Sequence, residues 1–215
     1  MDNWPNYMLN SHDYPRIVNR IGRARSRIAG MLLLTLRGIP ILYYGEEIGM
    51  ANVNLSKEQI KDPWEKIIHG MGRDRQRTPM QWDNKRYAGF SGGEPWLPTA
   101  QDLDEVNVNK QTYVFDSMLN LYRELLQIRK EFECLRVGDY HPLDLVENAF
   151  LFIRETKHQR ILIALNFSDR ASFIDLEPYS PDILLLTSYL DQRNVYLEKS
   201  YNLRPNEGII VLLNC

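Results

Sequence analysis

The sequence predicts an α/β segment followed by an antiparallel β segment. In residues 7–44, a short apolar run, a long helical run and a second β-prone run follow one another. This succession indicates a βαβ unit with two parallel strands. Beyond residue 137, short apolar runs are separated by turn residues, a pattern typical of a small antiparallel sandwich. We therefore predict two domains, residues 1–137 and residues 138–215.

The composition is that of a globular protein without a nucleic-acid or membrane partner. The chain has 215 residues, of which 44% are hydrophobic, and a formal net charge of -2. Nucleic-acid-binding proteins usually carry a basic excess instead. No apolar run approaches the ~18 residues of a membrane helix, and the first residues lack the features of a secretory signal. The two cysteines show no metal-ligand spacing, so we expect a cytoplasmic protein with no metal and no other cofactor.

The first half contains the two parallel strands and the helix that connects them. The first strand is expected at residues 7–9. Residues 19–38 read as a helix whose second half is almost continuously apolar, and Gly38 provides a typical C-terminal stop. The second strand is expected at residues 39–44, where the chain is apolar and rich in β-formers.

The middle of the chain is a long loop, and the remainder is a helix followed by strands. Residues 51–110 hold several prolines and tryptophans, which favours an ordered loop that builds part of a binding surface. Residues 113–132 have apolar side chains at spacings of three and four, as an amphipathic helix does. The predicted strands of the second domain are residues 149–155, 160–167, 172–176, 183–190 and 208–214.

Pairs of ionisable residues follow both strands of the βαβ unit. His12 and Asp13 come after the first strand, and Glu46 and Glu47 come after the second. In parallel α/β folds, functional groups lie beyond the carboxyl ends of the strands. On its own, the His-Asp pair is also explained as a turn anchor or a helix N-cap. The two glutamates could join Asp13 as the carboxylates of glycosidic hydrolysis, or one could cap the loop while the other pairs with an arginine.

Arginines are concentrated in two places. In the long loop, Arg73, Arg75 and Arg77 alternate within the stretch GRDRQRTPMQWD. Arginines near carboxylates can fix their charge and can bind substrate hydroxyls, although a solvated basic loop is an alternative. Five other arginines are expected to form the solvated face of a helix: Arg16, Arg20, Arg23, Arg25 and Arg27. No ligand spacing supports a metal site formed by His12, Asp13, His69 and Asp74.

Together these motifs resemble one enzyme family. The stretches SHDYPRI, LLLTLRGIPILYYGEEIGM, DPWEK, GRDRQRTPMQWD, AGFSGGEPWLP and NVNKQ occur in this order. In this respect the chain resembles the C-terminal part of a bacterial α-glucosidase of the α-amylase superfamily, over essentially its whole length. The resemblance implies that the first two strands are the seventh and eighth of a (β/α)8 TIM barrel. The helix at 113–132 would be the last barrel helix, followed by a C-terminal antiparallel β-sandwich domain.

The resemblance also implies roles for four residues. Asp13 matches the third acidic residue of the family, which binds sugar hydroxyls and helps to distort the ring without being the nucleophile. His12 matches a histidine that hydrogen-bonds the same sugar, and Arg73 and Arg77 match loop arginines that contact sugars. The glutamate pair at 46–47 matches residues outside the catalytic trio. Ser11 stands where the family usually has asparagine, and a serine offers a different reach and donor set.

The nucleophile and the general acid of the family precede the matched region in chain order. The resemblance therefore implies the C-terminal portion of a retaining α-glucosidase for short oligosaccharides, inactive alone as an enzyme. Its expected partners are a short α-glucoside and either the missing N-terminal barrel portion or other copies of the chain. The apolar runs at 31–36 and 41–44 are expected to pack on that missing portion.

Other functions fit the same scaffold. The parent protein could be a trehalose-synthase or transglycosidase type of enzyme, because linkage choice depends partly on residues outside the matched region. A non-catalytic protein that keeps the scaffold for binding or assembly is the alternative of a different class. The coding sequence upstream of the Met1 codon discriminates these possibilities, since missing barrel strands encoded there would support the enzyme.

Overall fold

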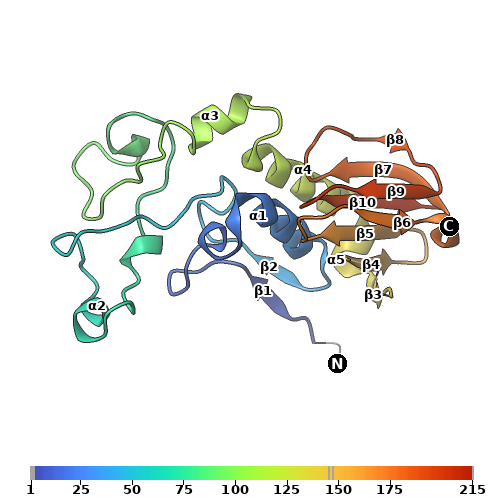
Figure 1. Ribbon diagram of the computed structural model, residues 1–215, viewed down its shortest axis with the longest axis horizontal. Coiled ribbons are helices and arrows are strands. Elements are labelled where there is room, and N and C mark those ends of the chain that lie inside the picture. Colours follow the sequence, from blue (N-terminus) through green and yellow to red (C-terminus); the bar gives the residue numbers. More distant parts are fainter. Residues whose placement is uncertain (1–2, 145, 147, 215) are drawn as a thin grey trace. The chain divides into compact units, whose positions relative to one another are not determined.

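The computed structural model describes residues 3–144, 146 and 148–214 (Figure 1). These residues form two compact units that do not follow chain order. The first unit contains the described residues of Met1–Tyr7, Arg27–Pro40 and Leu121–Cys215. The second unit contains Met8–Ser26 and Ile41–Asn120.

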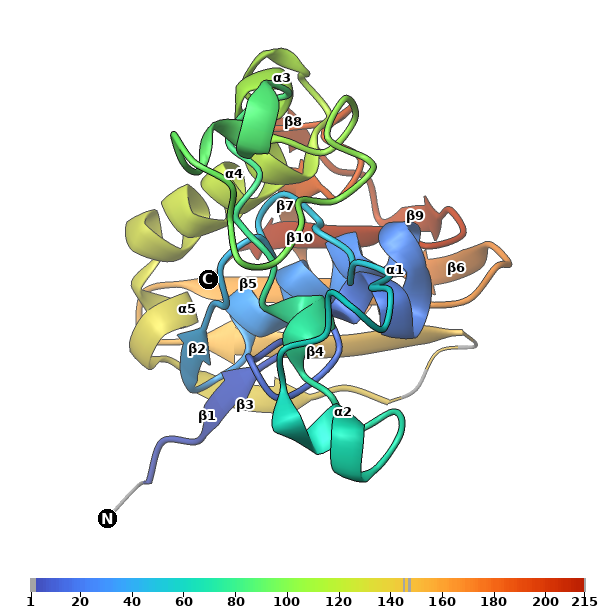
Figure 2. The same cartoon turned by 90° about the vertical axis from the view of Figure 1, so that its left-hand side faces the viewer.

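Antiparallel sheets form most of the first unit. One sheet has six strands in the order β3-β4-β5-β10-β7-β8, and β6 and β9 form a separate pair that lies side by side in both views (Figures 1 and 2). All these pairings are antiparallel, which confirms the prediction. The strands are β3 (Asp139–Pro142), β4 (Ala149–Glu155), β5 (Arg160–Asn166), β6 (Ser172–Asp175), β7 (Pro181–Thr187), β8 (Val195–Tyr196), β9 (Ser200–Leu203) and β10 (Gly208–Leu213).

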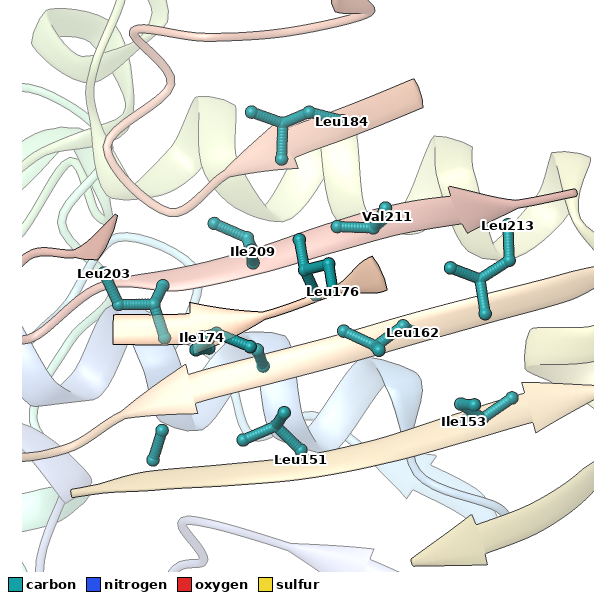
Figure 3. Packing of buried hydrophobic residues seen from close by; sticks show 12 residues of the cluster. Leu151, Ile153, Leu162, Ile174, Leu176, Leu184, Leu203, Ile209, Val211 and Leu213 are labelled. Atoms are coloured by element: carbon teal, nitrogen blue, oxygen red, sulfur yellow. The ribbon is translucent and has the colours of Figure 1, made fainter. Parts of the chain in front are cut away.

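The core of the first unit lies between the two sheets. Leu162 of β5 and Val211 of β10 project from the large sheet toward Ile174 of β6 and Leu203 of β9 (Figure 3). These side chains are fully buried, and burial of each stabilises the fold by roughly 1.5–3 kcal/mol. On β10, Gly208 faces α1, because a Cβ there would meet the Met31 sulfur at 2.7 Å.

Helix α1 (Ile17–Thr35) passes through both units. It includes a non-helical residue at Gly22, whose φ is 82°. Its apolar second half is buried, with Met31 and Leu34 almost fully covered. The expectation that this run needs further chain to cover it is therefore wrong, because the first unit already buries it.

Strands β1 (Asn6–Met8) and β2 (Ile39–Ile41) flank α1 in the chain and are neighbours in a two-stranded sheet. The second strand is shorter than the predicted 39–44. Tyr44 is engaged elsewhere, because its carbonyl accepts a hydrogen bond from Arg16 at 2.7 Å and its hydroxyl donates to the Thr78 carbonyl at 2.6 Å. Strand β2 accordingly ends at Ile41, before Tyr44.

The helix predicted at 113–132 also begins later than expected. Tyr113 ends α3 (Val108–Tyr113), and α4 covers Met118–Glu131. The break occurs at Ser117, whose hydroxyl accepts from the Asn120 backbone N–H at 3.1 Å as an N-cap does. The short helix α5 (Glu133–Val137) follows α4.

The second unit contains the long segment 51–110, which is not uniformly irregular. It includes α2 (Pro63–Ile67), the 3-10 helices η1 (Asp74–Gln76) and η2 (Arg86–Gly89), and the start of α3. The buried hydrophobic core of the second unit consists of Ile48, Met50, Met80, Val106 and Leu119. Among the residues described, no helix is long and apolar enough to cross a membrane.

Candidate functional site

The turn after β1 projects the predicted site residues outward. Ser11 closes this turn, since its hydroxyl accepts from the backbone N–H groups of Asp13 at 3.1 Å and Tyr14 at 3.2 Å. His12, Asp13 and Tyr14 are consequently exposed at its tip. Ser11 thus acts as a turn anchor.

Asn10 fixes the base of the same turn. Its side chain is buried, and its amide donates to the Glu46 carboxylate at 2.6 Å. Its carbonyl oxygen accepts from the Ile17 backbone N–H at the start of α1. Glu46 is therefore a buried partner of an asparagine. Glu47 is partly buried, and burial raises its pKa.

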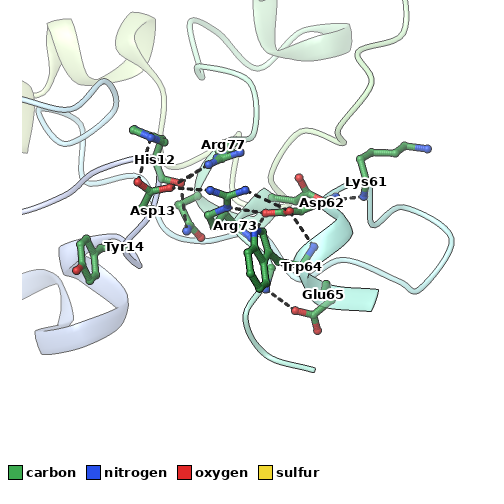
Figure 4. Close-up of polar contacts among 12 residues, drawn as sticks. His12, Asp13, Tyr14, Lys61, Asp62, Trp64, Glu65, Arg73 and Arg77 are labelled. Carbon is green, nitrogen blue, oxygen red and sulfur yellow. Dashed lines mark hydrogen bonds and ion pairs between the residues drawn. The ribbon is translucent and has the colours of Figure 1, made fainter. Parts of the chain in front are cut away.

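Asp13 is held by two arginines of the long loop (Figure 4). Arg73 Nη1 donates to Asp13 Oδ1 at 3.2 Å, and Arg77 Nη2 donates to the same oxygen at 3.1 Å. The other oxygen, Oδ2, lies 3.1 Å from His12 Nε2. Arg77 Nε also donates to the His12 carbonyl at 2.9 Å. The four residues singled out in the sequence therefore lie together around one carboxyl group that remains 45% exposed.

Two buried carboxyl groups support this cluster, and neither was predicted as a site residue. Asp62 Oδ2 accepts from Arg73 Nε at 2.7 Å and from the Arg73 backbone N–H at 3.0 Å. Asp74 Oδ2 in turn accepts from the backbone N–H groups of Lys61 at 2.6 Å and Asp62 at 2.7 Å. The hydrogen bonds from Arg73 hold the pKa of Asp62 well below its usual range.

A cavity of about 520 Å³ opens beside Asp13. Its walls include Tyr14 from the first turn, Trp64 from α2, and Arg73 and Gln76 from the loop. Trp64 is 49% exposed despite its size. Aromatic walls with a few convergent polar groups are typical of small-molecule sites of this volume. A separate cavity of about 650 Å³ lies in the first unit and contains none of the predicted site residues.

The residues considered for a metal site have other partners. His69 Nδ1 lies 3.0 Å from Glu65 Oε1, and Asp74 accepts backbone N–H groups. Throughout the described part of the chain, no three His, Cys, Asp or Glu side chains are grouped so that they could hold a metal ion.

Comparison with known proteins identifies the family. The model of the α-amylase catalytic domain matches residues 1–138. The chain belongs to the α-amylase family. It is 36% identical over 209 residues to a glucan 1,6-alpha-glucosidase of Streptococcus pneumoniae, a match that covers 86% of this chain and 39% of the relative. It is 32% identical over 240 residues to an oligo-1,6-glucosidase of Bacillus cereus, covering 98% of this chain and 43% of the relative.

Solved structures agree with this membership of the α-amylase family. The isomaltulose synthase of Protaminobacter rubrum superposes with a TM-score of 0.85 at 26% identity, over 99% of this chain and 43% of that one. The chain thus spans about two fifths of the length of the relatives that it matches. The family assignment made from the sequence motifs is confirmed.

Proposed function

We propose that the chain forms one side of the glucose-binding site of a retaining α-glucosidase that hydrolyses short oligosaccharides. The observation that carries this proposal is the Asp13 carboxyl group, held by Arg73 and Arg77 beside His12 in a chain of the α-amylase family. The relatives named oligo-1,6-glucosidase and glucan 1,6-alpha-glucosidase support the class of bond. In this proposal β1 and β2 are the seventh and eighth strands of a TIM barrel.

Each site residue has a part in the proposed chemistry. Asp13 accepts hydrogen bonds from hydroxyl groups of the sugar. It also stabilises the positive charge of the distorted, oxocarbenium-like transition state. His12 hydrogen-bonds the same ring, and the two arginines orient Asp13 and bind further hydroxyls. Retaining hydrolysis requires a nucleophile and an acid about 5 Å apart. We propose that both come from polypeptide outside these 215 residues, so that this chain alone is inactive, and that the enzyme acts in the cytoplasm.

The substitution Asp13→Asn tests this function. It is made in a protein that contains this chain together with the polypeptide that we propose completes the barrel. It should lower kcat on isomaltose by on the order of 10²-fold, because the lost charge acts mainly in the transition state. KM should change much less. Glu94→Gln, which changes an exposed acid of the same unit, is the control and should leave kcat unaffected.

A normal kcat in the Asp13 variant would refute the assigned role. If the unmodified protein has no hydrolase activity on any α-glucoside, a non-catalytic scaffold becomes the better explanation. Circular dichroism and thermal unfolding of both variants show whether a loss of rate comes from a loss of fold.

Transglycosylation or isomerisation is a second candidate, favoured by the solved structures that are similar to the chain. Several of these are named isomaltulose synthase or trehalulose synthase, and one contains sucrose, named there as the natural substrate. Incubation with sucrose and with isomaltose distinguishes the two reactions. Release of free glucose from isomaltose supports hydrolysis, whereas conversion of sucrose into an isomeric disaccharide supports isomerisation.

A further inference from the structure

Asp62 is a deeply buried charged group in contact with the proposed site. Its side chain is 1% exposed, and one of its partners, Arg73, reaches Asp13. We propose that Asp62 is a positioning residue for the reaction: it fixes the Arg73 guanidinium in the orientation that contacts Asp13. The same carboxylate caps the turn that places Trp64 on the cavity wall. This inference rests on the proposed function, which assigns Asp13 to the sugar.

The geometry of Arg73 leaves its guanidinium one orientation. Nε donates to Asp62 Oδ2 at 2.7 Å and Nη2 donates to Asp62 Oδ1 at 3.4 Å, so one edge of the planar group faces Asp62. Nη1 then points to Asp13, at 3.2 Å. Because a guanidinium is rigid and planar, fixing one edge also fixes the direction of the remaining donor.

Burial explains why Asp62 holds Arg73 firmly. A buried carboxylate without a partner is strongly unfavourable, so Asp62 retains its bonds to Arg73 and to the Trp64 backbone N–H at 3.1 Å. The Arg73 side chain is itself 33% exposed and would otherwise sample several rotamers. Pairing with Asp62 therefore holds the Arg73 guanidinium in one orientation.

Asp74 supports Asp62 in a reciprocal way. The Asp74 carboxylate accepts the backbone N–H of Asp62, while the Asp62 carboxylate accepts the backbone N–H of Arg73, the residue before Asp74. The segment before α2 and the segment that begins η1 thus bind each other through two buried carboxylates. This cross-connection keeps Asp62 in place beneath Arg73.

A purely structural role for Asp62 is the explanation to be excluded, and Glu65 provides the matched control. Glu65 is also a buried carboxyl group of this loop, with its side chain 6% exposed. It accepts the backbone N–H groups of Gly70 at 3.0 Å and Gly72 at 2.7 Å. Its hydrogen bonds thus tie the loop together through backbone groups, whereas those of Asp62 also include the guanidinium that reaches Asp13.

The kinetic test compares Asp62→Asn, Arg73→Gln, their combination and Glu65→Gln in the chain joined to the rest of its barrel. Asp62→Asn should lower kcat/KM on isomaltose about 10- to 100-fold, since a small displacement of a positioned group has effects of this size. The double variant should be no worse than Arg73→Gln, because Asp62 acts through Arg73. Glu65→Gln should change kcat/KM less than about threefold. Additive losses, or an equal loss in Glu65→Gln, would overturn the proposal.

A second measurement does not depend on activity. In the 215-residue chain, NMR should show slow hydrogen exchange at Arg73 Nε–H in the unmodified protein and in Glu65→Gln. In Asp62→Asn, exchange should be as fast as in exposed arginines. Slow exchange in Asp62→Asn would overturn the positioning role, and so would fast exchange in Glu65→Gln. Absence of hydrolysis in the unmodified enzyme would instead refute the proposed function. The hydrogen-exchange rates would still show whether Asp62 orients the Arg73 side chain.

Discussion

Arg16 and Arg73 carry the same charge and use it differently. Arg16 is fully buried, its guanidinium donates to the carbonyls of Tyr44 at 2.7 Å and Gln76 at 3.0 Å, and it lies over the rings of Tyr43 and Tyr44. Burial lowers its pKa. Arg73 instead lies at the cavity, where it meets Asp13. Arg16 therefore joins chain segments, and its predicted place on a solvated helix face is wrong.

The depressed pKa of Asp62 predicts an acid-dependent part of the stability. An aspartate in an unfolded chain has a pKa of about 3.9. The pKa of folded Asp62 is lower, because Arg73 hydrogen-bonds the charged form. The stabilisation is thus fully present above about pH 4 and is lost as the pH falls toward the folded pKa. Urea unfolding between pH 7 and pH 2.5 should show a stability difference between the unmodified chain and Asp62→Asn that shrinks below about pH 4. A difference that stays constant to pH 3 would contradict this origin.

At the residue scale, the sequence predicted the groups around the Asp13 carboxyl better than the buried groups that support them. His12, Asp13, Arg73 and Arg77 were found because they stand in motifs, and they lie together in the structure. Asp62 also stands in a matched stretch, DPWEK, but what marks its role there is only a carboxylate before a proline at a helix start. Its bond to a side chain 11 positions later depends on how the loop folds back, which no local pattern reports.

Among the elements, α2 contributes an aromatic residue, Trp64, to the cavity wall. Asp62 is its N-cap and Pro63 occupies its first turn, where a missing N–H costs nothing. The Trp64 carbonyl accepts the Ile68 backbone N–H at 2.8 Å, which closes the single turn. A short helix of this kind presents Trp64 as a fixed wall.

Trp64→Ala should therefore weaken the binding of a disaccharide. The apolar face of a sugar ring can pack on an indole, and an aromatic contact of this kind contributes about 0.5–1.5 kcal/mol. In the chain joined to the rest of its barrel, KM for isomaltose should rise about 3- to 10-fold with little change in kcat. Trp96→Ala, an equally large change at an exposed residue outside the cavity lining, should leave KM unchanged. Equal effects of the two variants would contradict a specific contact.

Element prediction succeeded where apolar runs were long. Strand β4 coincides with the predicted 149–155, and β5 and β10 differ from prediction by one residue each. Strands β3, β8 and β9 were missed, because Asp139–Pro142, Val195–Tyr196 and Ser200–Leu203 are short and mostly exposed. Such strands form because a neighbouring strand offers hydrogen-bonding groups, which is a tertiary effect.

At the scale of the whole molecule, exposed apolar side chains gather around the two-stranded sheet. Met8 and Ile39 are each 51% exposed, and Ile41 and Leu42 are also exposed. Among the described residues, β1 and β2 have only each other as partners. Each strand therefore keeps an edge with unpaired backbone groups, and such edges tend to associate.

We therefore expect the 215-residue chain to self-associate through β1 and β2 in a concentration-dependent way. Light scattering should show particles larger than the monomer, and hydrogen exchange should show weak protection at residues 39–44 in dilute samples. Strands β4, β5 and β10 should remain strongly protected, since they are paired and buried within their own unit.

The double variant Ile39→Lys and Ile41→Lys should suppress the association, because lysines on an edge strand oppose pairing. Lysine substitution of Phe173, a more exposed apolar residue of β6, is the control and should leave the association in place. A monodisperse monomer with strong protection at 39–44 would show that the two strands need no further partner. Association that survives the Ile39 and Ile41 changes but disappears with Phe173→Lys would assign the contact to the β-sheet unit instead.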